Sequence, residues 1–388
     1  EIMSSDWSSD VCSSDLKNRG QGFPALLKNI TFKFRKSVMT SEQVKKQLEK
    51  VIRHQNCTGC GACVLFSGGT SRMTGTSRGP VPLLDNALFS EEALQACPGI
   101  GIHYPELYDR HHGSQPDNYL HGMVQRVRIG YAADEKIRRR AASGGVITSV
   151  LLYLLKEKLV DGVVCVRQGL PSPSEASAII ARTAGEIADA MQSVYIPVSL
   201  LDKLSEFKPG ERYALVGLPE QTATLRKLQQ MGHPAAQQVR YVLGPYTGTA
   251  LYPAAIRAFL RSKHVRSDDP VTSLKWREGE WPGYLEIRTA SGRVLQSKKI
   301  YYNFLIPFYV THTSLRSMDF VNEFADLAVG DAWSPRYEKE GKGFSVFVTR
   351  SEEMEKIVSA MTKGGLPEAE ENRAEEVPAE GMPAEGIP

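Results

Sequence analysis

Four cysteines have the spacing expected of ligands for an iron–sulfur cluster. Cys57, Cys60 and Cys63 follow one another as C-x2-C-x2-C, and the distant Cys97 is followed directly by proline. Three closely spaced thiolates can hold one face of a cubane cluster while a distant fourth completes it. In two-cluster bacterial ferredoxins a further cysteine serves the other cluster, but here that position is Ser67. The spacing therefore predicts one [4Fe–4S] cluster.

The same cysteines allow two other interpretations, a zinc site and disulfide bonds. Zinc sites usually combine two C-x2-C pairs, which this spacing does not provide. A disulfide between cysteines three residues apart would be strained, and no feature indicates secretion. We therefore favour the cluster, with Gly59 and Gly61 allowing a tight backbone turn between its ligands. Cys165 lies in the apolar run DGVVCV and is expected to be a small core residue.

A second candidate site is the Ser-Gly-Gly sequence at 143–145, directly before the apolar helical pattern VITSVLLYLLKEK. Such a start leaves backbone N–H groups free for an anion, and Arg140 lies close by in sequence. Ser-Gly-Gly at a helix start is more often a plain cap, so the motif alone identifies no ligand. Similarly, residues 216–228 indicate a strand, a turn and a helix with Pro219 at its first position, which is common in α/β proteins.

Composition and charge narrow the class of protein. The chain of 388 residues is 41% hydrophobic and 23% charged, which is typical of a globular protein and not of a disordered, collagenous or coiled-coil one. No run approaches the roughly 18 apolar residues of a membrane-spanning helix, so we expect no integral membrane segment. We also expect no nucleic-acid partner, because no recognised binding module and no basic run with interleaved aromatics is present.

The two ends differ from the rest of the chain. Residues 6–16, DWSSDVCSSDL, match a translated sequencing-library adapter, so we interpret 1–38 as adapter and non-native leader and expect Met39 as the native start. Residues 365–388 are an acidic, Pro-rich tail that we expect to be disordered. Residues 1–16 carry a charge of −4 and 367–388 of −6, which leaves +13 on 17–366. That basic body favours anionic partners.

Between these ends the hydrophobic pattern predicts strands alternating with helices. A helix should start at Thr40 with a capping box to Gln43, and a short helix capped by Ser90 should end at Cys97. We interpret 64–88 as loop and 105–122 as a linker. Strands are predicted at 160–166, 177–183, 213–218, 239–244, 271–276, 325–331 and 343–350, with a hairpin over 284–297. Helices are predicted at 144–157, 220–231, 249–263 and 351–361.

Seven segments occurring in order resemble the beta-subunit family of coenzyme F420 hydrogenases and dehydrogenases, which also includes reductases of the chlorophyll pathway. They span about 50–350: CTGCGAC, RAASGGVITSVL, VDGVV, SVYIPV, VGLPEQTATLRKL, WREGEWPG and FADLAVGDAWSP. The resemblance implies an α/β (α+β) protein in which a ferredoxin-like [4Fe–4S] segment (39–115) precedes an α/β FAD-binding body with a mixed sheet. The N-terminal part of that body would be 116–235 and the C-terminal part 236–364.

The resemblance also assigns site residues. The family's Ser-Gly-Gly, Ser-x-Tyr-x-Pro, Gly-x-Pro-Cys-Gln and late Gly-Asp motifs fall on positions that we expect to bind FAD. These are Ser143, Gly144, Gly145, Ser193, Tyr195, Gly217, Pro219, Gln221, Gly330 and Asp331, with Arg140 beside the first. Where the family has further cysteines, this chain has Glu220, Thr247, Ser314 and Ser317. Because hydroxyls and carboxylates are poor replacements for thiolates at iron, we expect a second cluster to be lost and these four residues to surround a small polar pocket.

The function implied is that of a cytoplasmic iron–sulfur flavoprotein oxidoreductase. It would pass electrons between a ferredoxin-like or F420-type carrier and a substrate through FAD and one cluster on Cys57, Cys60, Cys63 and Cys97, with F420 itself a candidate substrate. Glu220 is a candidate proton donor, or simply a first-turn Glu favoured by the helix dipole. The alternative is a non-catalytic electron-transfer subunit that docks on a larger hydrogenase, dehydrogenase or biosynthetic complex.

Two aromatic residues and two histidines near these motifs have open roles. Trp276 and Trp281 can stack on a flavin, but such residues more often pack a core. His54 is expected to be a solvated residue at a helix end, and His312 a proton donor only in a minority interpretation.

Overall fold

The computed structural model describes residues 39–298, 303–364 and 368–371. The leader 1–38 and most of the acidic tail therefore lie outside the described residues. From Met39 onward the described residues belong to one unit of the chain. No helix among them is long and apolar enough to cross a membrane.

The cysteine-containing segment begins with a helix that the sequence predicted. In α1 (Ser41–Arg53) the side chain of Thr40 accepts from the N–H of Gln43, whose side chain reciprocates, and Val44, Leu48 and Val51 are buried. The rest of the segment consists of η1 (Ala62–Phe66), β1 (Met73–Thr76), β2 (Gly79–Pro82) and α2 (Glu92–Ala96). The helix α2 ends at Cys97 as expected, but it is preceded by Glu91 and has no side-chain cap, so the Ser90 cap was wrong.

Two stretches assigned to loop or linker contain regular structure. Residues 64–88 hold the antiparallel hairpin of β1 and β2, in which Thr76 faces Gly79 across the turn. Residues 105–122 overlap α3 (Tyr104–His112), whose Leu107 and Tyr108 are buried against Ala223 and Phe324. Both elements depend on surfaces supplied by distant parts of the chain, which local composition does not reveal.

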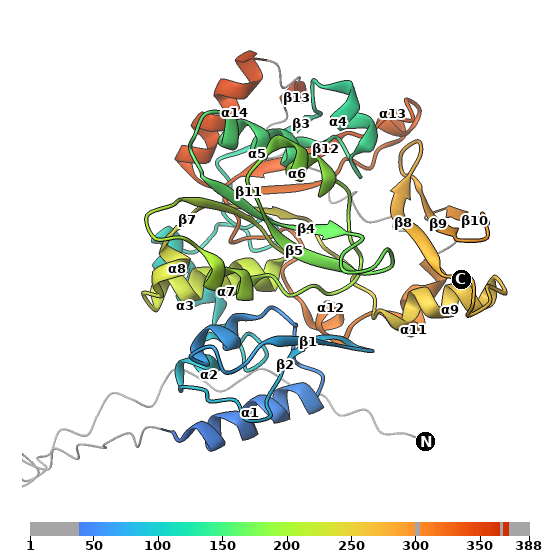
Figure 1. Cartoon of the computed structure of the whole chain (residues 1–388). Helices are drawn as coiled ribbons and strands as arrows, with labels where there is room; N and C mark the ends of the chain where they lie inside the picture. The colour runs from blue at the N-terminus through green and yellow to red at the C-terminus, as the bar shows by residue number, and fades with distance from the viewer. Residues whose placement is uncertain (1–38, 299–302, 365–367, 372–388) are drawn as a thin grey trace, which may run out of the picture. The chain divides into compact units, whose positions relative to one another are not determined.

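The body is built on an eight-stranded mixed sheet in the order β13-β3-β12-β11-β7-β6-β4-β5 (Figure 1). The strands β4, β6, β7 and β11 are parallel, and β5, β12, β3 and β13 are antiparallel to their neighbours. Their bounds are β3 Arg126–Gly130, β4 Gly162–Gln168, β5 Ala176–Ala181, β6 Tyr213–Val216, β7 Val239–Pro245, β11 Leu327–Asp331, β12 Ser345–Thr349 and β13 Glu368–Glu371. The mixed α/β sheet is confirmed.

The sheet is covered on both faces, because alternate residues of its strands enter two different cores. Val163 packs with α5 (Val146–Lys156) and α14 (Glu352–Gly364). Its neighbour Val164 packs with α7 (Pro219–Gln230), η2 (Leu201–Glu206) and Cys60 of the cysteine segment. Figure 1 shows α5 and α14 on one side of the sheet and α7 on the other. The cysteine segment is therefore part of the same packed unit as the body.

A second, three-stranded antiparallel sheet, β10-β9-β8, packs with α9 (Ala254–Ser262) around Trp276. Its strands are β8 (Val271–Glu278), β9 (Tyr284–Thr289) and β10 (Val294–Lys298), and the predicted hairpin turn contains Gly292 at a φ of 84°. The other helices of the described residues are α4 (Glu135–Arg140), α6 (Ala184–Asp189), α8 (Pro234–Gln237), η3 (Asn303–Leu305), α11 (Ile306–Tyr309), α12 (His312–Arg316) and α13 (Pro335–Glu338).

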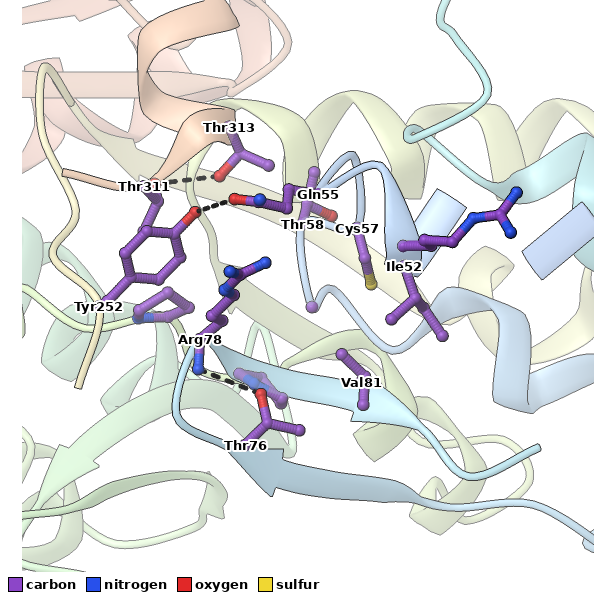
Figure 2. A pocket seen from close by; sticks show the side chains of 14 residues that line it. Ile52, Gln55, Cys57, Thr58, Thr76, Arg78, Val81, Tyr252, Thr311 and Thr313 are labelled. Carbon is purple, nitrogen blue, oxygen red and sulfur yellow. Dashed lines mark hydrogen bonds between the residues drawn. The ribbon is translucent and has the colours of Figure 1, made fainter. Parts of the chain in front are cut away.

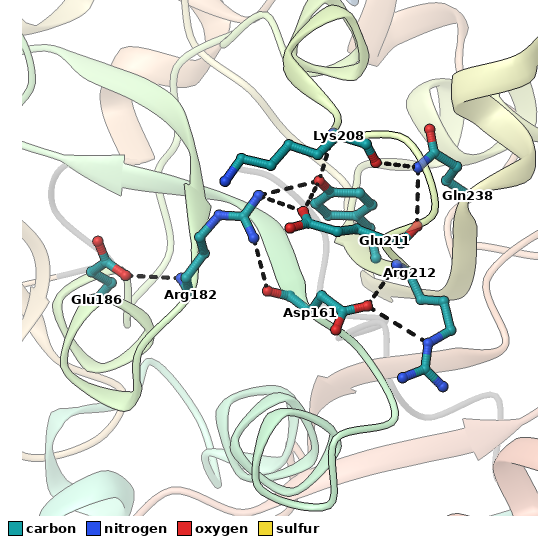
Figure 3. A network of polar contacts seen from close by, with 8 residues as sticks. Asp161, Arg182, Glu186, Lys208, Glu211, Arg212 and Gln238 are labelled. Atoms are coloured by element: carbon teal, nitrogen blue, oxygen red, sulfur yellow. Dashed lines mark hydrogen bonds and ion pairs between the residues drawn. The ribbon is translucent and has the colours of Figure 1, made fainter.

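A polar network holds the edge at which the parallel strands begin (Figure 3). Arg182 donates to Glu211 at 2.7 Å and to the carbonyl of Asp161 at 3.2 Å. The N–H of Arg212 donates to the Asp161 carboxylate at 2.8 Å, and the Gln238 amide donates to the Glu211 carbonyl at 3.0 Å. These contacts fix the starts of β4, β6 and β7, so the opposite edge is left for loops that carry chemistry.

The C-terminal expectation needs a correction. We expected 365–388 to be disordered, but residues 368–371 form β13, which pairs antiparallel with β3 through Glu368 and Gly130. An acidic composition does not prevent a strand from adding to a sheet edge, because main-chain hydrogen bonds supply the pairing.

Candidate functional site

The loop that carries three of the cysteines turns twice through left-handed backbone. Gly59 and Gly61 have φ values of 70° and 90°, a region that favours glycine. A Cβ at Gly59 would lie 2.8 Å from Pro80 of β2, and one at Gly61 would lie 2.5 Å from Ser199. The Cys60 carbonyl accepts from the N–H of Leu201 at 2.8 Å. The predicted tight turns are present, and they fasten the loop to the body.

The four cysteines lie together in an environment with little access to water. Cys60, Cys63 and Cys97 are buried and Cys57 is half-buried, and all are free thiols. Burial raises the pKa of Cys57 to about 11 and that of Cys60 to about 12. The negative charge of a Cys97 thiolate would raise the pKa values of the other three further, which places Cys97 beside them. The disulfide interpretation is not supported, since no described cysteine is paired.

Backbone amides also face these sulfurs. Donation from Gly59 to Cys57, from Ala62 to Cys60 and from Gly99 to Cys97 lowers the pKa of each acceptor, against the larger effect of burial. No three His, Cys, Asp or Glu side chains of the described residues come together as ligands of a single metal ion. A cubane makes a different demand, because each of its thiolates binds a different iron atom. Cys165 is buried in the core under α5, as predicted.

At the edge where the parallel strands end, two family-matched residues meet a third that sequence reasoning missed. Arg277 of β8 forms a 2.9 Å ion pair with Asp331 at the end of β11, and its guanidinium lies 3.5 Å from the Tyr195 hydroxyl. Arg277 is only 3% exposed. The Arg277 side chain also donates to the Pro282 carbonyl at 2.6 Å. The predicted Tyr195 and Asp331 are therefore brought together, through the arginine of the WREGEWPG segment.

Two buried donors at this edge have no partner in the described residues. They are Nη2 of Arg277 and the indole Nε1 of Trp281. The Trp281 ring lies 4.5 Å from that of Trp333 in a tilted arrangement, and Trp333 follows β11 by two residues, whereas Trp276 is a core residue as the commoner interpretation predicted. Unsatisfied buried donors cost about 1–3 kcal/mol each, so they mark a place where an acceptor-rich ligand would be stabilised.

The Ser143–Gly145 turn lies beside this edge, but part of it is already engaged. Ser143 Oγ donates to the Phe344 carbonyl at 2.7 Å, and the Gly144 N–H donates to Ser345 Oγ at 2.9 Å. Ser345 is the cross-strand partner of Asp331. A Cβ on Gly144 would lie 2.6 Å from the Gly130 carbonyl oxygen. The turn is therefore a packed junction, and the free anion donors are the first amides of α5, which no intrahelical carbonyl can reach.

Other family-matched residues shape the loops. Gln221 accepts from the Leu218 N–H and donates to the Val198 carbonyl, both at 3.0 Å, so its amide is fully used in joining α7 to the 193–198 segment. A Cβ on Gly330 would lie 2.3 Å from the Tyr246 ring, which explains the absence of a side chain there. Gly217 accepts from the Asn322 amide at 2.8 Å, and Pro219 begins α7 as predicted.

Two of the predicted positions lie apart from these contacts. Arg140 is exposed and donates to the Ala188 carbonyl at 3.2 Å, and Ser193 is half-buried in the chain between Gln192 and Tyr195. Gln192 donates to the Arg277 carbonyl at 3.4 Å, which places this stretch beside the same arginine. His54 caps the end of α1 and is exposed, as expected.

The four residues at former cysteine positions do converge. Glu220, Thr247, Ser314 and Ser317 all line one cavity of about 40 Å³, which Thr58 of the cysteine loop also borders. Ser314 Oγ accepts from the Ala250 N–H at 2.9 Å, and Thr247 Oγ1 donates to the Pro245 carbonyl at 3.2 Å. The predicted convergence of the four residues is present, while apolar side chains such as Pro197, Val198 and Leu218 also line the cavity. It is large enough to hold water, and it lies between the cysteine loop and the end of β7.

A pair of buried acids that sequence reasoning missed lies close to this cavity. Asp319 is 1% and Glu323 5% exposed, and the Glu323 N–H donates to both oxygens of Asp319 at 3.0 and 3.1 Å. Burial, and then the charge of Glu323, raise the pKa of Asp319 to about 7. The Tyr108 hydroxyl donates to Glu323, so α3 is tied to the body through this pair.

Comparison with known proteins identifies the body. The family model for the N-terminal part of the coenzyme F420 hydrogenase/dehydrogenase beta subunit matches residues 127–205. The corresponding model for the C-terminal part matches residues 210–375. The chain belongs to the coenzyme F420 hydrogenase/dehydrogenase beta-subunit family. The two matched ranges together cover nearly all of the eight-stranded sheet, whereas Cys57, Cys60, Cys63 and Cys97 precede both.

Curated relatives of this F420 beta-subunit family member include redox enzymes of methanogens. The chain is 22% identical over 260 residues to the coenzyme F420 hydrogenase subunit beta of Methanothermobacter thermautotrophicus, covering 63% of this chain and 84% of that protein. It is 26% identical over 236 residues to the coenzyme F420-dependent sulfite reductase of Methanocaldococcus jannaschii, covering 56% of this chain and 34% of that protein.

A solved structure shares the fold of this family member. It is a chain of the xenon-derivatised F420-reducing [NiFe] hydrogenase complex from Methanosarcina barkeri. The TM-score is 0.53 at 20% identity, and the match covers 68% of this chain and 86% of that one. The likeness supports the mixed α/β architecture of the body.

Proposed function

We propose that this protein is an iron–sulfur flavoprotein oxidoreductase that carries one [4Fe–4S] cluster and one FAD. The observation that carries the proposal is the gathering of four free, largely buried thiols, three in a loop fastened to the body of an F420 beta-subunit fold and the fourth, Cys97, at the end of α2. Relatives named as hydrogenase and formate dehydrogenase beta subunits support a redox role.

Cys57, Cys60, Cys63 and Cys97 would hold the cluster, which supplies single-electron transfer when bound. The donor set fits, because thiolates are the ligands that iron–sulfur clusters use. The amides that face Cys57, Cys60 and Cys97 would stabilise the negative charge at the sulfurs. Binding of the cluster would displace the thiol protons, and the positive charge of its iron atoms would offset the burial of the resulting thiolates.

FAD would lie at the edge where β11 and β6 end. The donors fit an acceptor-rich group there, since Nη2 of Arg277 and Nε1 of Trp281 are buried without partners among the described residues. The first amides of α5 and the side chain of Arg140 would bind its phosphates, and Tyr195 and Asp331 would orient Arg277. The flavin supplies hydride and one-electron chemistry when bound.

Protons for the flavin chemistry would come from the small cavity that Glu220 lines. Glu220 lies at the first turn of α7 and lines the water-sized cavity, and its carboxylate has no hydrogen-bond or ion-pair partner in the described part of the chain. A carboxyl in contact with cavity water can exchange protons with it. Glu220 is therefore our candidate proton donor, and the hydroxyls of Ser314, Ser317 and Thr247 would order the water.

The partner is a redox protein or a larger catalytic assembly. An electron-transfer role without a substrate of its own is the second candidate function, favoured by the coverage of 84% of a hydrogenase beta subunit. Anaerobic purification followed by an absorbance spectrum and by iron, sulfide and flavin analysis tests the proposal. We expect about four iron, about four sulfide and one flavin per chain. Stoichiometric zinc without sulfide, or a protein that binds no flavin, would disprove it.

A further inference from the structure

A cavity lined by described residues opens beside Cys57 (Figure 2). Its volume of about 370 Å³ falls in the range of small-molecule sites, which span roughly 300–1,000 Å³. Three segments form it: the end of α1 with the cysteine loop, the β1–β2 hairpin, and body residues that include Pro197 and Tyr252. It adjoins the small cavity at Glu220, because Thr58, Pro197 and Thr313 line both.

The walls of this pocket are held by contacts between the segments. A Cβ at Gly79 would lie 3.1 Å from Pro197, and one at Gly59 would lie 2.8 Å from Pro80. The hairpin therefore packs closely against the body on one side and against the cysteine loop on the other. At the back, the Tyr252 hydroxyl donates to Gln55 at 3.4 Å and accepts from the His312 N–H at 3.1 Å. These contacts hold the three segments that line the cavity in position relative to one another.

The charged side chains that line this pocket are all basic. Arg53 and Arg78 line the pocket, and no Asp or Glu does. Neither arginine has an ion-pair partner among the described residues. Arg78 sits at the hairpin turn, where its N–H donates to Thr76 Oγ1 at 3.1 Å. In Figure 2 its guanidinium and the Cys57 sulfur point toward the same space. Arg78 is exposed, and its guanidinium would pair with an anionic group bound there.

The rest of the lining is largely apolar. Ile52, Pro80, Val81, Pro197 and the Tyr252 ring form walls, and threonine hydroxyls from 311 and 313 lie at one end. Apolar walls favour a hydrophobic ligand body, and a few convergent polar groups orient it. A ligand with its charge at Arg78 would place its apolar part against Cys57, the most exposed of the four cysteines.

We propose that this pocket binds a small organic anion, a carboxylate or phosphate ester with an apolar body, with its charge at Arg78 and its body against Cys57. The proposal deepens the proposed function by naming a ligand class for the cluster side of the protein, and it rests on that function in taking Cys57 as a cluster ligand. Binding itself requires no turnover.

The test uses anaerobically purified full-length protein and isothermal titration with phenyl phosphate and benzoate. Benzyl alcohol is the neutral analogue. We expect saturable binding of at least one anion, at least tenfold weaker binding of benzyl alcohol, and at least tenfold weaker anion binding by Arg78→Ala. Arg72→Ala is the matched control, because Arg72 is exposed next to the same hairpin but does not line the pocket. A preference for phenyl phosphate or for benzoate assigns the anion as phosphate or carboxylate.

A second variant separates the loss of binding from a loss of folding, and a spectroscopic measurement asks whether the bound anion lies beside the cluster. Val81→Ser should weaken binding of the aromatic anions while the melting temperature stays unchanged. In the reduced protein, phenyl phosphate should shift the electron paramagnetic resonance of the cluster in wild type and not in Arg78→Ala. Absence of saturable binding, or equal binding by wild type and Arg78→Ala, overturns the inference. Arg78-dependent binding to a protein without iron would instead overturn only the proposed function.

Discussion

The guanidinium of Arg277 lies 2.9 Å from the carboxylate of Asp331, and this ion pair joins the three-stranded sheet to the end of β11 in the main sheet. Both side chains are shielded from water, with 3% and 14% of their surfaces exposed. The pair also positions Nη2 of Arg277, which has no partner among the described residues. Asp331 thus acts on the candidate flavin edge by orienting an arginine, because its carboxylate faces that arginine.

Replacing Asp331 tests the strength of this junction. Asp331→Asn should leave Arg277 buried without a counter-charge and lower the free energy of unfolding by about 3–5 kcal/mol. Asp268→Asn is the control, because its pair with Arg266 is exposed on both sides and such pairs contribute about 0–1 kcal/mol. Urea denaturation of both variants makes the measurement. Equal losses in the two would show that Arg277 is stabilised by other groups.

The cluster assignment predicts a sharp difference between two buried cysteines. Cys60→Ala should abolish the cluster absorbance and reduce iron and sulfide to background, because a cubane requires about four strong ligands. Cys165→Ala should keep full iron content, since Cys165 packs in the core under α5. Metal analysis after anaerobic purification decides the matter. Retention of iron by Cys60→Ala would remove Cys60 from the ligand set.

Flavin binding should depend on Arg140 of α4 and not on Lys136 of the same helix. Arg140→Ala should weaken FAD binding about tenfold, which is the loss expected for a charge-assisted contact to phosphate of about 1.4 kcal/mol. Lys136→Ala removes the same charge from the same short helix and should bind FAD as wild type does. Flavin fluorescence during titration of the apoprotein provides both constants. Gly144 is unsuitable for this test, because any Cβ there would disrupt the packing against β3.

The buried acids predict an unusual dependence of stability on pH. In the unfolded chain Asp319 should titrate near its ordinary value of 3.8, whereas in the folded chain its pKa is about 7. Between those values the unfolded chain releases a proton that the folded chain keeps, so this group lowers the free energy of unfolding as pH rises from about 4 to 7. The loss should be on the order of a few kcal/mol and complete above pH 7.

Comparing wild type with Asp319→Asn isolates that contribution. Asparagine keeps an acceptor for the Glu323 N–H but cannot ionise, so the stability difference between the two proteins should change steadily across this window. The charged groups that face Asp319 are Glu323, Arg350 and Glu220, and the Tyr104 ring also lies near it. Glu323 has a raised pKa as well, so the two carboxyls titrate as a pair. Parallel stability curves for the two proteins would contradict the prediction.

The convergence at Glu220 makes a gain-of-function experiment available. A variant that combines Glu220→Cys, Thr247→Cys, Ser314→Cys and Ser317→Cys should take up about four additional iron atoms on anaerobic reconstitution. The same variant with Ser314 retained is the control and should gain markedly less. If the four-cysteine protein gains no iron, then these positions were never a cluster site in relatives, although they share one cavity here.

Sequence reasoning was most reliable where local pattern and family motif agreed. The capping box of Thr40 and the alternating strands were predictable from spacing along the chain, and the meeting of four scattered polar residues was predictable from the resemblance to the family, which has cysteines at those positions. The β1–β2 hairpin was missed because its Gly- and Pro-rich strands are stabilised by Pro197 and the cysteine loop. Similarly, α3 was missed because its burial depends on Ala223 and Phe324, more than one hundred residues away.

The roles of site residues were harder to predict than their positions. Ser143 and Gly144 look like a free anion site in sequence, but Ser345, about 200 residues later, takes up two of their hydrogen-bonding groups. Arg277 was overlooked because nothing in a single sequence distinguishes it from a solvent-exposed strand residue. Only the tertiary structure shows that it is buried against Asp331 and Tyr195.

The place of β3 in the sheet has a consequence for how this protein is made. β3 is the first strand of the main sheet to be synthesised, yet both of its neighbours, β12 and β13, follow it by more than 200 residues. During translation β3 must therefore remain unpaired while the middle of the sheet assembles from β4, β6 and β7. The turn at Ser143–Gly145 also lacks its hydrogen-bond partner during this time, because Ser345 lies on β12. A nascent chain should thus be unable to complete this part of the candidate flavin site until the last strands leave the ribosome.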